Sequence, residues 1–282
     1  MQIFNTQHSL EQYLLGIRES HKTIALVPTM GALHEGHLSL IQQAKQSADI
    51  TICSIFVNPT QFNDPKDLEK YPRPLENDIS LLKSASCDIL FLPSVEEMYP
   101  DPNENWQLNL GDLETIWEGE HRPGHFQGVT QIVYKLFTLV QPDFACFGQK
   151  DFQQVMVVQK MIDIKQLPIK LIISPIIRDQ QGLALSSRNM RLSTEGKTKA
   201  LALSKALRYV QANFKSIATD ELTQRGKEII HSEEGVTLEY FAICETKTLQ
   251  QVNELHADKA YVALVVAWVE GVRLLDNMLL NE

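Results

Sequence analysis

The sequence predicts an α/β protein: a Rossmann-like open parallel sheet with helices on both faces, followed by a smaller C-terminal α+β domain. Three observations support this. Short apolar or β-branched runs alternate with segments of helical spacing over residues 1–176, which is typical of right-handed crossovers in a parallel sheet. The alternation stops in residues 177–282, whose composition suits a small α+β fold. A length of 282 residues also favours two domains.

Five strands are expected in the first domain. In chain order they cover residues 23–27, 50–57, 87–92, 143–147 and 170–177. The helices expected between them carry apolar side chains at helical spacing, at 38–44, 75–82, 129–140 and 152–164. Open parallel sheets bind ligands beyond the carboxyl ends of their strands, so this order indicates where a ligand site should lie.

The second domain is expected to begin with a turn. Asp179-Gln180-Gln181-Gly182 is a turn signal, so residues 177–187 are predicted to form a hairpin. Helical stretches follow at 197–214 and 221–231, and β runs at 238–244 and 260–269. We place the domain boundary near residue 176 and expect the C-terminal domain to act as a lid.

Composition argues against several classes of protein. Acidic residues number 35 against 26 basic ones, giving a net charge of −9, so nucleic acid is not expected as a partner. The longest apolar run, 260–269, is about half of what a membrane span requires. The first residues show no signal peptide, so a cytoplasmic location is predicted. The four cysteines lack a Cys-x-x-Cys pairing and lie in or beside apolar runs, which indicates buried free thiols.

The segment 28–38 (Pro-Thr-Met-Gly-Ala-Leu-His-Glu-Gly-His-Leu) lies between the first expected strand and helix. Gly31 and Gly36 have the spacing of a P-loop, but the Lys-Ser/Thr pair of that loop is missing, so a magnesium-binding Walker loop is not expected. His34 and His37 lie instead at a helix N-terminus, where backbone N–H groups and the helix dipole favour an anion. We interpret the segment as phosphate-binding; a pair of surface or capping histidines is the alternative.

The His-x-Gly-His pattern resembles a nucleotidyltransferase superfamily that acts at the α-phosphate of nucleoside triphosphates. Further segments, in order, narrow the resemblance to the pantothenate synthetase family. These segments are 28–37, 56–62, 71–73, 148–154 and 185–189. The resemblance implies an ATP-dependent condensation of (R)-pantoate with β-alanine through a pantoyl-adenylate, which releases AMP and pyrophosphate. It also implies ATP as a substrate, Mg²⁺ and a homodimer.

The resemblance assigns roles to individual residues. His37, His34 and Lys150 would be catalytic, with His37 in the acid role and the Lys150 ammonium bridging the α-phosphate and the attacking carboxylate. The resemblance also implies a set of ATP-binding residues, with Ser186, Ser187 and Arg188 as a phosphate clamp. That set is Met30, Gly31, His34, Gly36, His37, Gly148, Gln149, Lys150, Asp151, Ile177, Leu185, Ser186, Ser187 and Arg188. The family usually has Glu at the position of Gln149.

Gln61 and Gln154 resemble the residues that hold pantoate, and their amides can both donate and accept hydrogen bonds. Gln61 would also contact β-alanine. Asp78 resembles the family's magnesium-linked acidic position, although Asn77 stands where an acidic residue is often found. The alternatives are a polar loop residue for Gln61, a helix-surface residue for Gln154 and a solvated carboxylate for Asp78.

Three other functions fit part of the pattern. Another nucleotidyltransferase of the superfamily would share His34 and His37, but it would have no reason to carry Gln61 and Gln154 in these contexts. A nucleic-acid-binding module derived from an aminoacyl-tRNA synthetase core is disfavoured by the charge of −9. A catalytically dead scaffold is disfavoured by the intact histidines and Lys150. No definite task follows from the sequence for His125.

Overall fold

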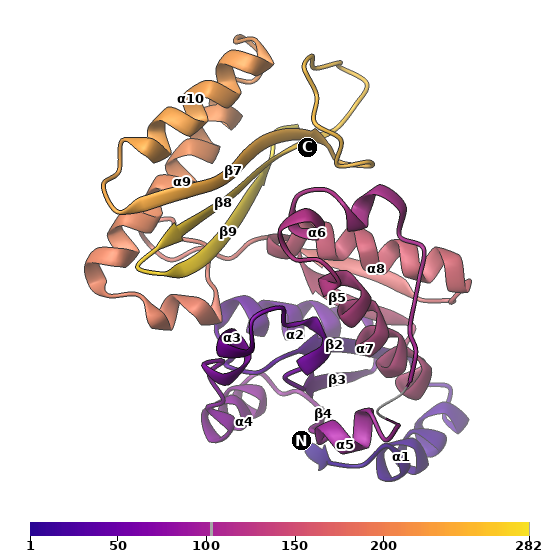
Figure 1. The fold of residues 1–282 in the computed structure, drawn as a ribbon. Helices are drawn as coiled ribbons and strands as arrows, with labels where there is room; N and C mark the ends of the chain where they lie inside the picture. Colours follow the sequence, from indigo (N-terminus) through magenta and orange to yellow (C-terminus); the bar gives the residue numbers. More distant parts are fainter. Residues whose placement is uncertain (102–103, 282) are drawn as a thin grey trace. The chain divides into compact units, whose positions relative to one another are not determined.

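A computed structural model describes residues 1–101 and 104–281 (Figure 1). Their contacts divide the chain into two compact units. The first unit comprises Met1–Gly148 and Gln153–Pro175, and the second comprises Gln149–Phe152 and Ile176–Glu282. The segment Gln149–Phe152 thus groups with the second unit, whereas the sequence prediction placed it within the first domain.

The first unit contains a six-stranded sheet in the order β1-β4-β3-β2-β5-β6, and every neighbouring pair of strands is parallel. The strands are β1 (Gln2–Phe4), β2 (Ile24–Thr29), β3 (Ile50–Ile55), β4 (Ile89–Phe91), β5 (Phe144–Gly148) and β6 (Lys170–Ser174). This confirms the predicted fold class. Strand β1 was missed, because three residues are too short to show a period.

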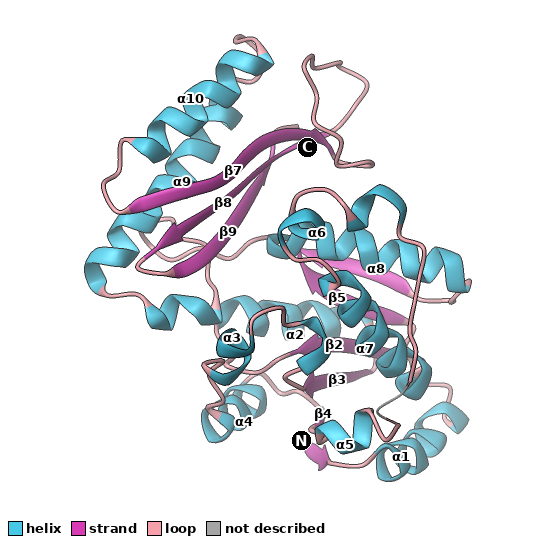
Figure 2. Ribbon diagram, in the orientation of Figure 1, coloured by secondary structure: helices cyan, strands magenta, loops and turns pink. Residues whose placement is uncertain are grey.

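Helices cover both faces of this sheet (Figure 2). The α-helices are α1 (Gln7–Glu19), α2 (Glu35–Ser47), α3 (Pro65–Glu69), α4 (Leu75–Ser84), α5 (Val95–Met98), α6 (Glu118–His121), α7 (His125–Val140) and α8 (Phe152–Lys165). Short 3-10 turns occur at η1 (Pro59–Gln61), η2 (Gly111–Glu114) and η3 (Gln149–Asp151). Alternation along β2 separates the faces: Ile24 and Leu26 pack with α1, α7 and α8, and Ala25 and Val27 pack with α2 and α4.

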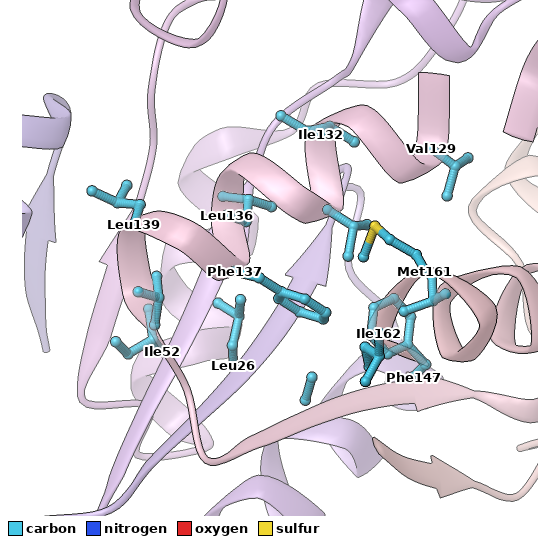
Figure 3. Packing of buried hydrophobic residues seen from close by; sticks show 14 of the residues in the cluster. Leu26, Ile52, Val129, Ile132, Leu136, Phe137, Leu139, Phe147, Met161 and Ile162 are labelled. Atoms are coloured by element: carbon cyan, nitrogen blue, oxygen red, sulfur yellow. The ribbon is translucent and has the colours of Figure 1, made fainter. Parts of the chain in front are cut away.

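Helix α7 supplies much of the larger core. Its Leu136 and Phe137 are each 2% exposed and lie in one cluster with Leu26 of β2 and Ile52 of β3 (Figure 3). Met161 of α8 belongs to the same cluster. Each fully buried side chain of this size contributes about 1.5–3 kcal/mol, so this helix and sheet fix each other's position.

The strand order reverses between β2 and β5. From β2, the strands β3, β4 and β1 extend in one direction, and β5 and β6 extend in the other. Helix α2 after β2 and helix α8 after β5 belong to clusters on opposite faces. Such a reversal leaves a crevice at the carboxyl ends of the two strands, where open α/β sheets bind ligands. Those ends are Thr29, before the histidine loop, and Gly148, before Lys150.

The second unit packs two helices on an antiparallel sheet in the order β7-β8-β9. Its elements are η4 (Ser187–Arg191), α9 (Thr194–Asn213), α10 (Thr219–His231), β7 (Val236–Glu245), β8 (Tyr261–Val269) and β9 (Val272–Leu279). The predicted hairpin at 177–187 is present in short form: an antiparallel bridge joins Arg178 and Ala184, and Leu185 and Asp179 donate backbone hydrogen bonds to Ile177 and Leu183 on either side of it. Strand β9 was missed because polar residues interrupt its apolar alternation. In the part of the chain that the structure describes, no helix is long and apolar enough to cross a bilayer.

Candidate active site

The histidine loop ends in a cap on helix α2. The Nδ1 atom of His34, the N-cap residue, accepts a hydrogen bond from the Gly36 N–H at 3.1 Å. The His34 N–H donates in turn to Nδ1 of His37 at 3.3 Å. The two rings lie 4.1 Å apart between centroids. Because each Nδ1 accepts an amide hydrogen, a neutral ring carries its own hydrogen on Nε2, so each imidazole can act as a donor through that atom.

Asp78 holds the loop in place from helix α4. Its carboxylate oxygens accept the N–H groups of Ala32 and Leu33, both at 2.8 Å, and the residue is 1% exposed. Burial raises the pKa of this carboxyl, although the two amide hydrogen bonds act in the opposite direction. Gly31 has a φ of 80°, and a Cβ there would lie 3.0 Å from an Asp78 oxygen, so the tight turn depends on glycine. The alternative of a solvated carboxylate at Asp78 is therefore wrong.

Gln61 lies at the end of η1, 8% exposed, with its side chain fixed by neighbours. Its Oε1 accepts a hydrogen bond from Nδ2 of Asn58 at 3.1 Å, and its Nε2 points at the sulfur of Met30 at 3.2 Å. Asn58 also donates to the carbonyl of Gly128 at 3.0 Å and accepts from the Tyr99 hydroxyl at 2.8 Å. Burial raises the pKa of Tyr99 to about 12, so its hydroxyl stays protonated as a donor.

The backbone of Gln61 is held by the loop before helix α7. Nδ1 of His125 lies 2.8 Å from the Gln61 carbonyl oxygen, and Nε2 lies 3.0 Å from a guanidinium nitrogen of Arg122. A guanidinium only donates, so Nε2 of His125 accepts and its Nδ1 carries the hydrogen that the Gln61 carbonyl accepts. His125 thus has a task that its sequence context did not reveal: it fixes the backbone that carries Gln61.

Lys150, Ser186, Arg188 and Arg273 line one pocket of the second unit. The Asp276 carboxylate lines the same pocket, so cationic and acidic side chains share it. Ser186 also caps η4 by accepting the Arg188 N–H at 3.3 Å. Arg273, for which the sequence predicted no role, forms an ion pair with Glu239 at 2.7 Å.

The structure places the other predicted residues as follows. Gln154 is half-buried on α8, and its neighbour Gln153 is buried and binds the loop around α6 through the Glu118 N–H and the Leu113 carbonyl. Gly148 ends β5, and Asp151 ends η3. Ile177 pairs with Leu185 through a backbone hydrogen bond of 3.0 Å. Within residues 1–101 and 104–281, no three His, Cys, Asp or Glu side chains gather as a metal cluster would.

A family model described as pantoate–β-alanine ligase matches residues 2–279. The chain belongs to the pantoate–β-alanine ligase family. It is therefore an enzyme, and the fold and loop described above are those of a ligase family.

Curated relatives support the same family over the whole length. A pantothenate synthetase of Porphyromonas gingivalis is 44% identical over 278 residues, covering 99% of this chain and 99% of that protein. One from Bacteroides thetaiotaomicron is 42% identical over 282 residues and covers 100% of both.

Solved structures agree. The pantothenate synthetase of Thermus thermophilus has a TM-score of 0.94 and 37% identity and covers 100% of both chains. The pantoate–β-alanine ligase of Francisella tularensis, described as complexed with β-γ ATP and β-alanine, has a TM-score of 0.81 and 36% identity. It covers 99% of this chain and 97% of that one.

Proposed function

We propose that this enzyme joins pantoate to β-alanine at the expense of ATP, through a pantoyl-adenylate. The observation that carries the proposal is the histidine loop at the reversal of strand order, where the imidazoles of His34 and His37 lie at a helix N-terminus. Family membership supplies the substrates. The Francisella tularensis relative is described as complexed with β-γ ATP and β-alanine, which supports the same ligands here.

In the first step, a carboxylate oxygen of pantoate attacks the α-phosphorus and the bond to pyrophosphate breaks. Negative charge grows on the phosphate oxygens, and the Nε2–H donors of His34 and His37 stabilise it. Gln61 and Gln154 hold pantoate by hydroxyls and carboxylate, and Gln61 also contacts β-alanine. The Lys150 ammonium offsets repulsion between the two anionic reactants, while Ser186, Ser187 and Arg188 bind the phosphates.

In the second step, the β-alanine amine attacks the acyl carbon of the adenylate. The bond from that carbon to the AMP oxygen breaks, AMP leaves, and the nitrogen loses a proton as the amide forms. Activation is required because a carboxylate is a poor electrophile and AMP is a far better leaving group than oxide. Exclusion of water by the C-terminal lid would protect the adenylate from hydrolysis.

Asp78 holds the histidine loop, and the resemblance also links this carboxylate to Mg²⁺. Both of its oxygens already accept backbone amides at 2.8 Å. Mg²⁺ is usually bound by few carboxylates together with substrate phosphates. We propose that Asp78 shapes the loop and that its remaining lone pairs would help to hold Mg²⁺ when the ion is bound with ATP. A homodimer is proposed on the family resemblance alone, and the cytoplasmic location predicted from the sequence stays a proposal.

The test is an incubation of purified protein with MgATP and pantoate, with β-alanine added to half of the samples. We expect AMP release that requires both acids, and pantoate-dependent ATP–pyrophosphate exchange when β-alanine is absent. Turnover without any such exchange would contradict the adenylate route. A folded protein that shows no turnover with pantoate would show that the acceptor acid is a different one.

A further inference from the structure

Asn277 of strand β9 is buried where an exposed residue is expected. Along β9, Val272 and Leu274 face the core of the second unit, and the alternate residues Arg273 and Leu275 are only half-buried. Asn277 follows the alternate positions but is 1% exposed. Its cover on that face includes the Gln149–Lys150 segment, to which its amide is hydrogen-bonded.

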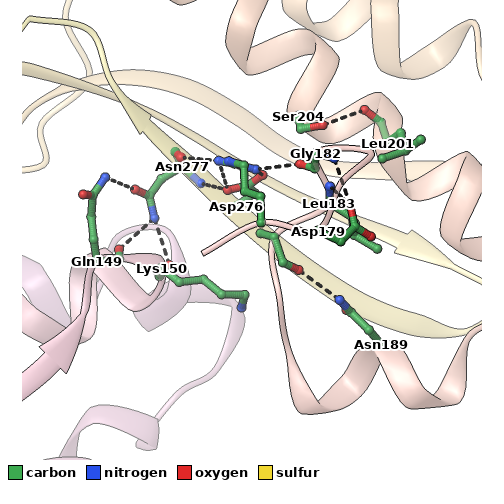
Figure 4. Close-up of polar contacts among 12 residues, drawn as sticks. Gln149, Lys150, Asp179, Gly182, Leu183, Asn189, Leu201, Ser204, Asp276 and Asn277 are labelled. Atoms are coloured by element: carbon green, nitrogen blue, oxygen red, sulfur yellow. Dashed lines mark hydrogen bonds and ion pairs between the residues drawn. The ribbon is translucent and has the colours of Figure 1, made fainter. Parts of the chain in front are cut away.

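The side-chain amide of Asn277 uses both of its donor hydrogens and its acceptor oxygen in this contact (Figure 4). Nδ2 of Asn277 donates to the carbonyl oxygen of Lys150 at 2.8 Å and to that of Gln149 at 3.0 Å. Oδ1 accepts a hydrogen bond from Nε2 of Gln149 at 3.2 Å. A buried amide is tolerated when its donors and acceptors are satisfied, so these bonds fix the backbone of Lys150 rather than only covering it.

The Asn277 backbone is itself fixed by an ion pair. Arg178 binds Asp276 through two nitrogens, at 2.6 and 2.9 Å, and also donates to the Asn277 carbonyl oxygen at 3.3 Å. A carboxylate oxygen of Asp276 accepts the Asn277 N–H at 2.8 Å. Asp276 is 5% exposed, and a two-pronged Arg–carboxylate contact restrains orientation as well as distance.

The same ion pair reaches the segment that carries the clamp residues. Arg178 donates to the Gly182 carbonyl oxygen at 3.2 Å, within the turn that leads to Ser186. Asn189 donates from the far side of the clamp to the Ala184 carbonyl oxygen at 2.9 Å. One continuous set of contacts therefore links the Lys150 backbone, strand β9 and the clamp segment (Figure 4).

We infer that Asn277 is a positioning residue for Lys150, setting the place of its ammonium relative to Ser186 and Arg188. The inference rests on the proposed role of Lys150 in adenylate formation. It explains why Gln149–Phe152 groups with the second unit although it directly follows β5 of the first. It also gives the backbone carbonyl of Gln149 a role, as an acceptor for Asn277. The family usually has Glu at this position.

The decisive variant is Asn277→Asp, which keeps the shape of the side chain but, when ionised, places a carboxylate against two carbonyl oxygens. Asn281→Asp is the matched control: Asn281 follows β9, donates to the Lys259 carbonyl oxygen at 2.6 Å and accepts the Tyr261 N–H at 2.9 Å. Adenylate formation is measured in single turnovers with full-length enzyme in excess, alongside thermal unfolding. The same measurement is made for Lys150→Ala and for the double variant.

We expect Asn277→Asp to slow adenylate formation about tenfold to a hundredfold, because a small misplacement of a catalytic group is costly. Asn281→Asp should stay within about twofold, and Asn277→Asp should add less than about twofold to Lys150→Ala. Asn277→Ser keeps one donor, so its rate of adenylate formation should lie between those of wild type and Asn277→Asp. If Asn277→Asp does not fold, Asn277→Ser takes its place in the comparison of single and double variants.

Equal losses from Asn277→Asp with and without the Lys150 side chain would mean a general structural role and would overturn the inference. A wild-type rate for Asn277→Asp, together with an inactive Lys150→Ala, would also overturn the inference. That outcome would leave the proposed role of Lys150 intact. A wild-type rate for Lys150→Ala would overturn that role, and the positioning inference with it.

Discussion

Single side chains set the conformation of the histidine loop. Asp78 binds two consecutive amides of the loop, and His34 and His37 satisfy amides at the start of α2. Their contacts are local in space but not in sequence, since Asp78 lies more than forty residues from the loop. Substitutions here therefore change loop geometry as well as chemistry, and the two effects can be separated by experiment.

Asp78→Asn tests the role of Asp78 in holding the loop. The variant places an NH₂ group against an amide donor and should lower the free energy of unfolding by about 1–3 kcal/mol. Because the folded pKa is raised above 3.8, the native state binds this proton more tightly than the unfolded chain. The group's stabilisation is fully present below the unfolded pKa and is lost as pH rises through the folded pKa.

The stability deficit of Asp78→Asn should therefore shrink as the pH is raised from about 4 towards neutrality. Urea unfolding of wild type and variant at a series of pH values measures this difference, and the contributions of all other titrating groups cancel in it. A deficit that grows with pH would mean that the two amide hydrogen bonds lower the pKa of Asp78 by more than burial raises it.

His34→Asn separates capping from chemistry. Asn is among the best N-cap residues, so this variant should keep the stability of α2, whereas His34→Ala should lose about 1 kcal/mol. Both variants lack the imidazole and should be equally slow in pantoate-dependent ATP–pyrophosphate exchange. Unfolding and exchange are measured on the same preparations. Full exchange activity in His34→Asn would remove His34 from the proposed mechanism.

At the scale of elements, the approach of α7 to η1 shapes the proposed pantoate site. A Cβ added to Gly128 would overlap the Thr60 carbonyl oxygen and lie 2.7 Å from the Gln61 nitrogen, so only glycine allows this approach. Asn58 bonds across the same contact. The position of Gln61 thus depends on the packing of a helix that is distant in sequence.

Gly128→Ala should separate α7 from η1, with a loss of about 1–3 kcal/mol in unfolding free energy and a raised KM for pantoate. Gly16→Ala is the matched control, because Gly16 lies in helix α1 and its added Cβ would meet no atom within 4 Å. The control should gain up to about 1 kcal/mol from helix propensity, with unchanged kinetics. If Gly128→Ala leaves the KM for pantoate unchanged, η1 does not set the position of Gln61.

At the scale of the whole molecule, each unit has its own apolar core, and each unit contains at least one buried cysteine. Cys53, Cys87 and Cys146 lie in the first unit and Cys244 in the second, all of them free and buried. This confirms the predicted free thiols. Burial raises the pKa of Cys87 to about 11 and those of Cys146 and Cys244 to about 12, and it raises the pKa of Cys53 as well.

The native enzyme should consequently show no thiol that reacts promptly with a disulfide reagent at about pH 8, because both thiolate and access are missing. All 4 cysteines should react once denaturant is added. Labelling at intermediate denaturant, followed by peptide mapping, shows whether Cys244 is exposed together with the other three. Prompt labelling of one thiol in the folded enzyme would contradict the burial described.

The fold could be predicted wherever a segment carries its own period. Strands β2, β3 and β5 are apolar runs bounded by turn residues, and α7 and α9 show helical spacing, so local physics identifies them. Strand β9 was not predicted because polar residues that contact other segments, Arg273, Asp276 and Asn277, interrupt its alternation of apolar and polar residues. For the same reason Asn58, which looks like an ordinary turn residue, did not emerge as the partner of Gln61.

The sequence by itself determined the α/β class, the family and the residues of the histidine loop, because these depend on local periodicity and on contiguous motifs. Only the tertiary structure decided that Asp78 binds the loop, that His125 fixes Gln61, and that the segment after β5 is bound by Asn277. These tasks arise from hydrogen bonds between buried groups far apart in the chain. Such hydrogen bonds form where tertiary packing excludes water, and a local sequence pattern does not show which distant groups are buried together.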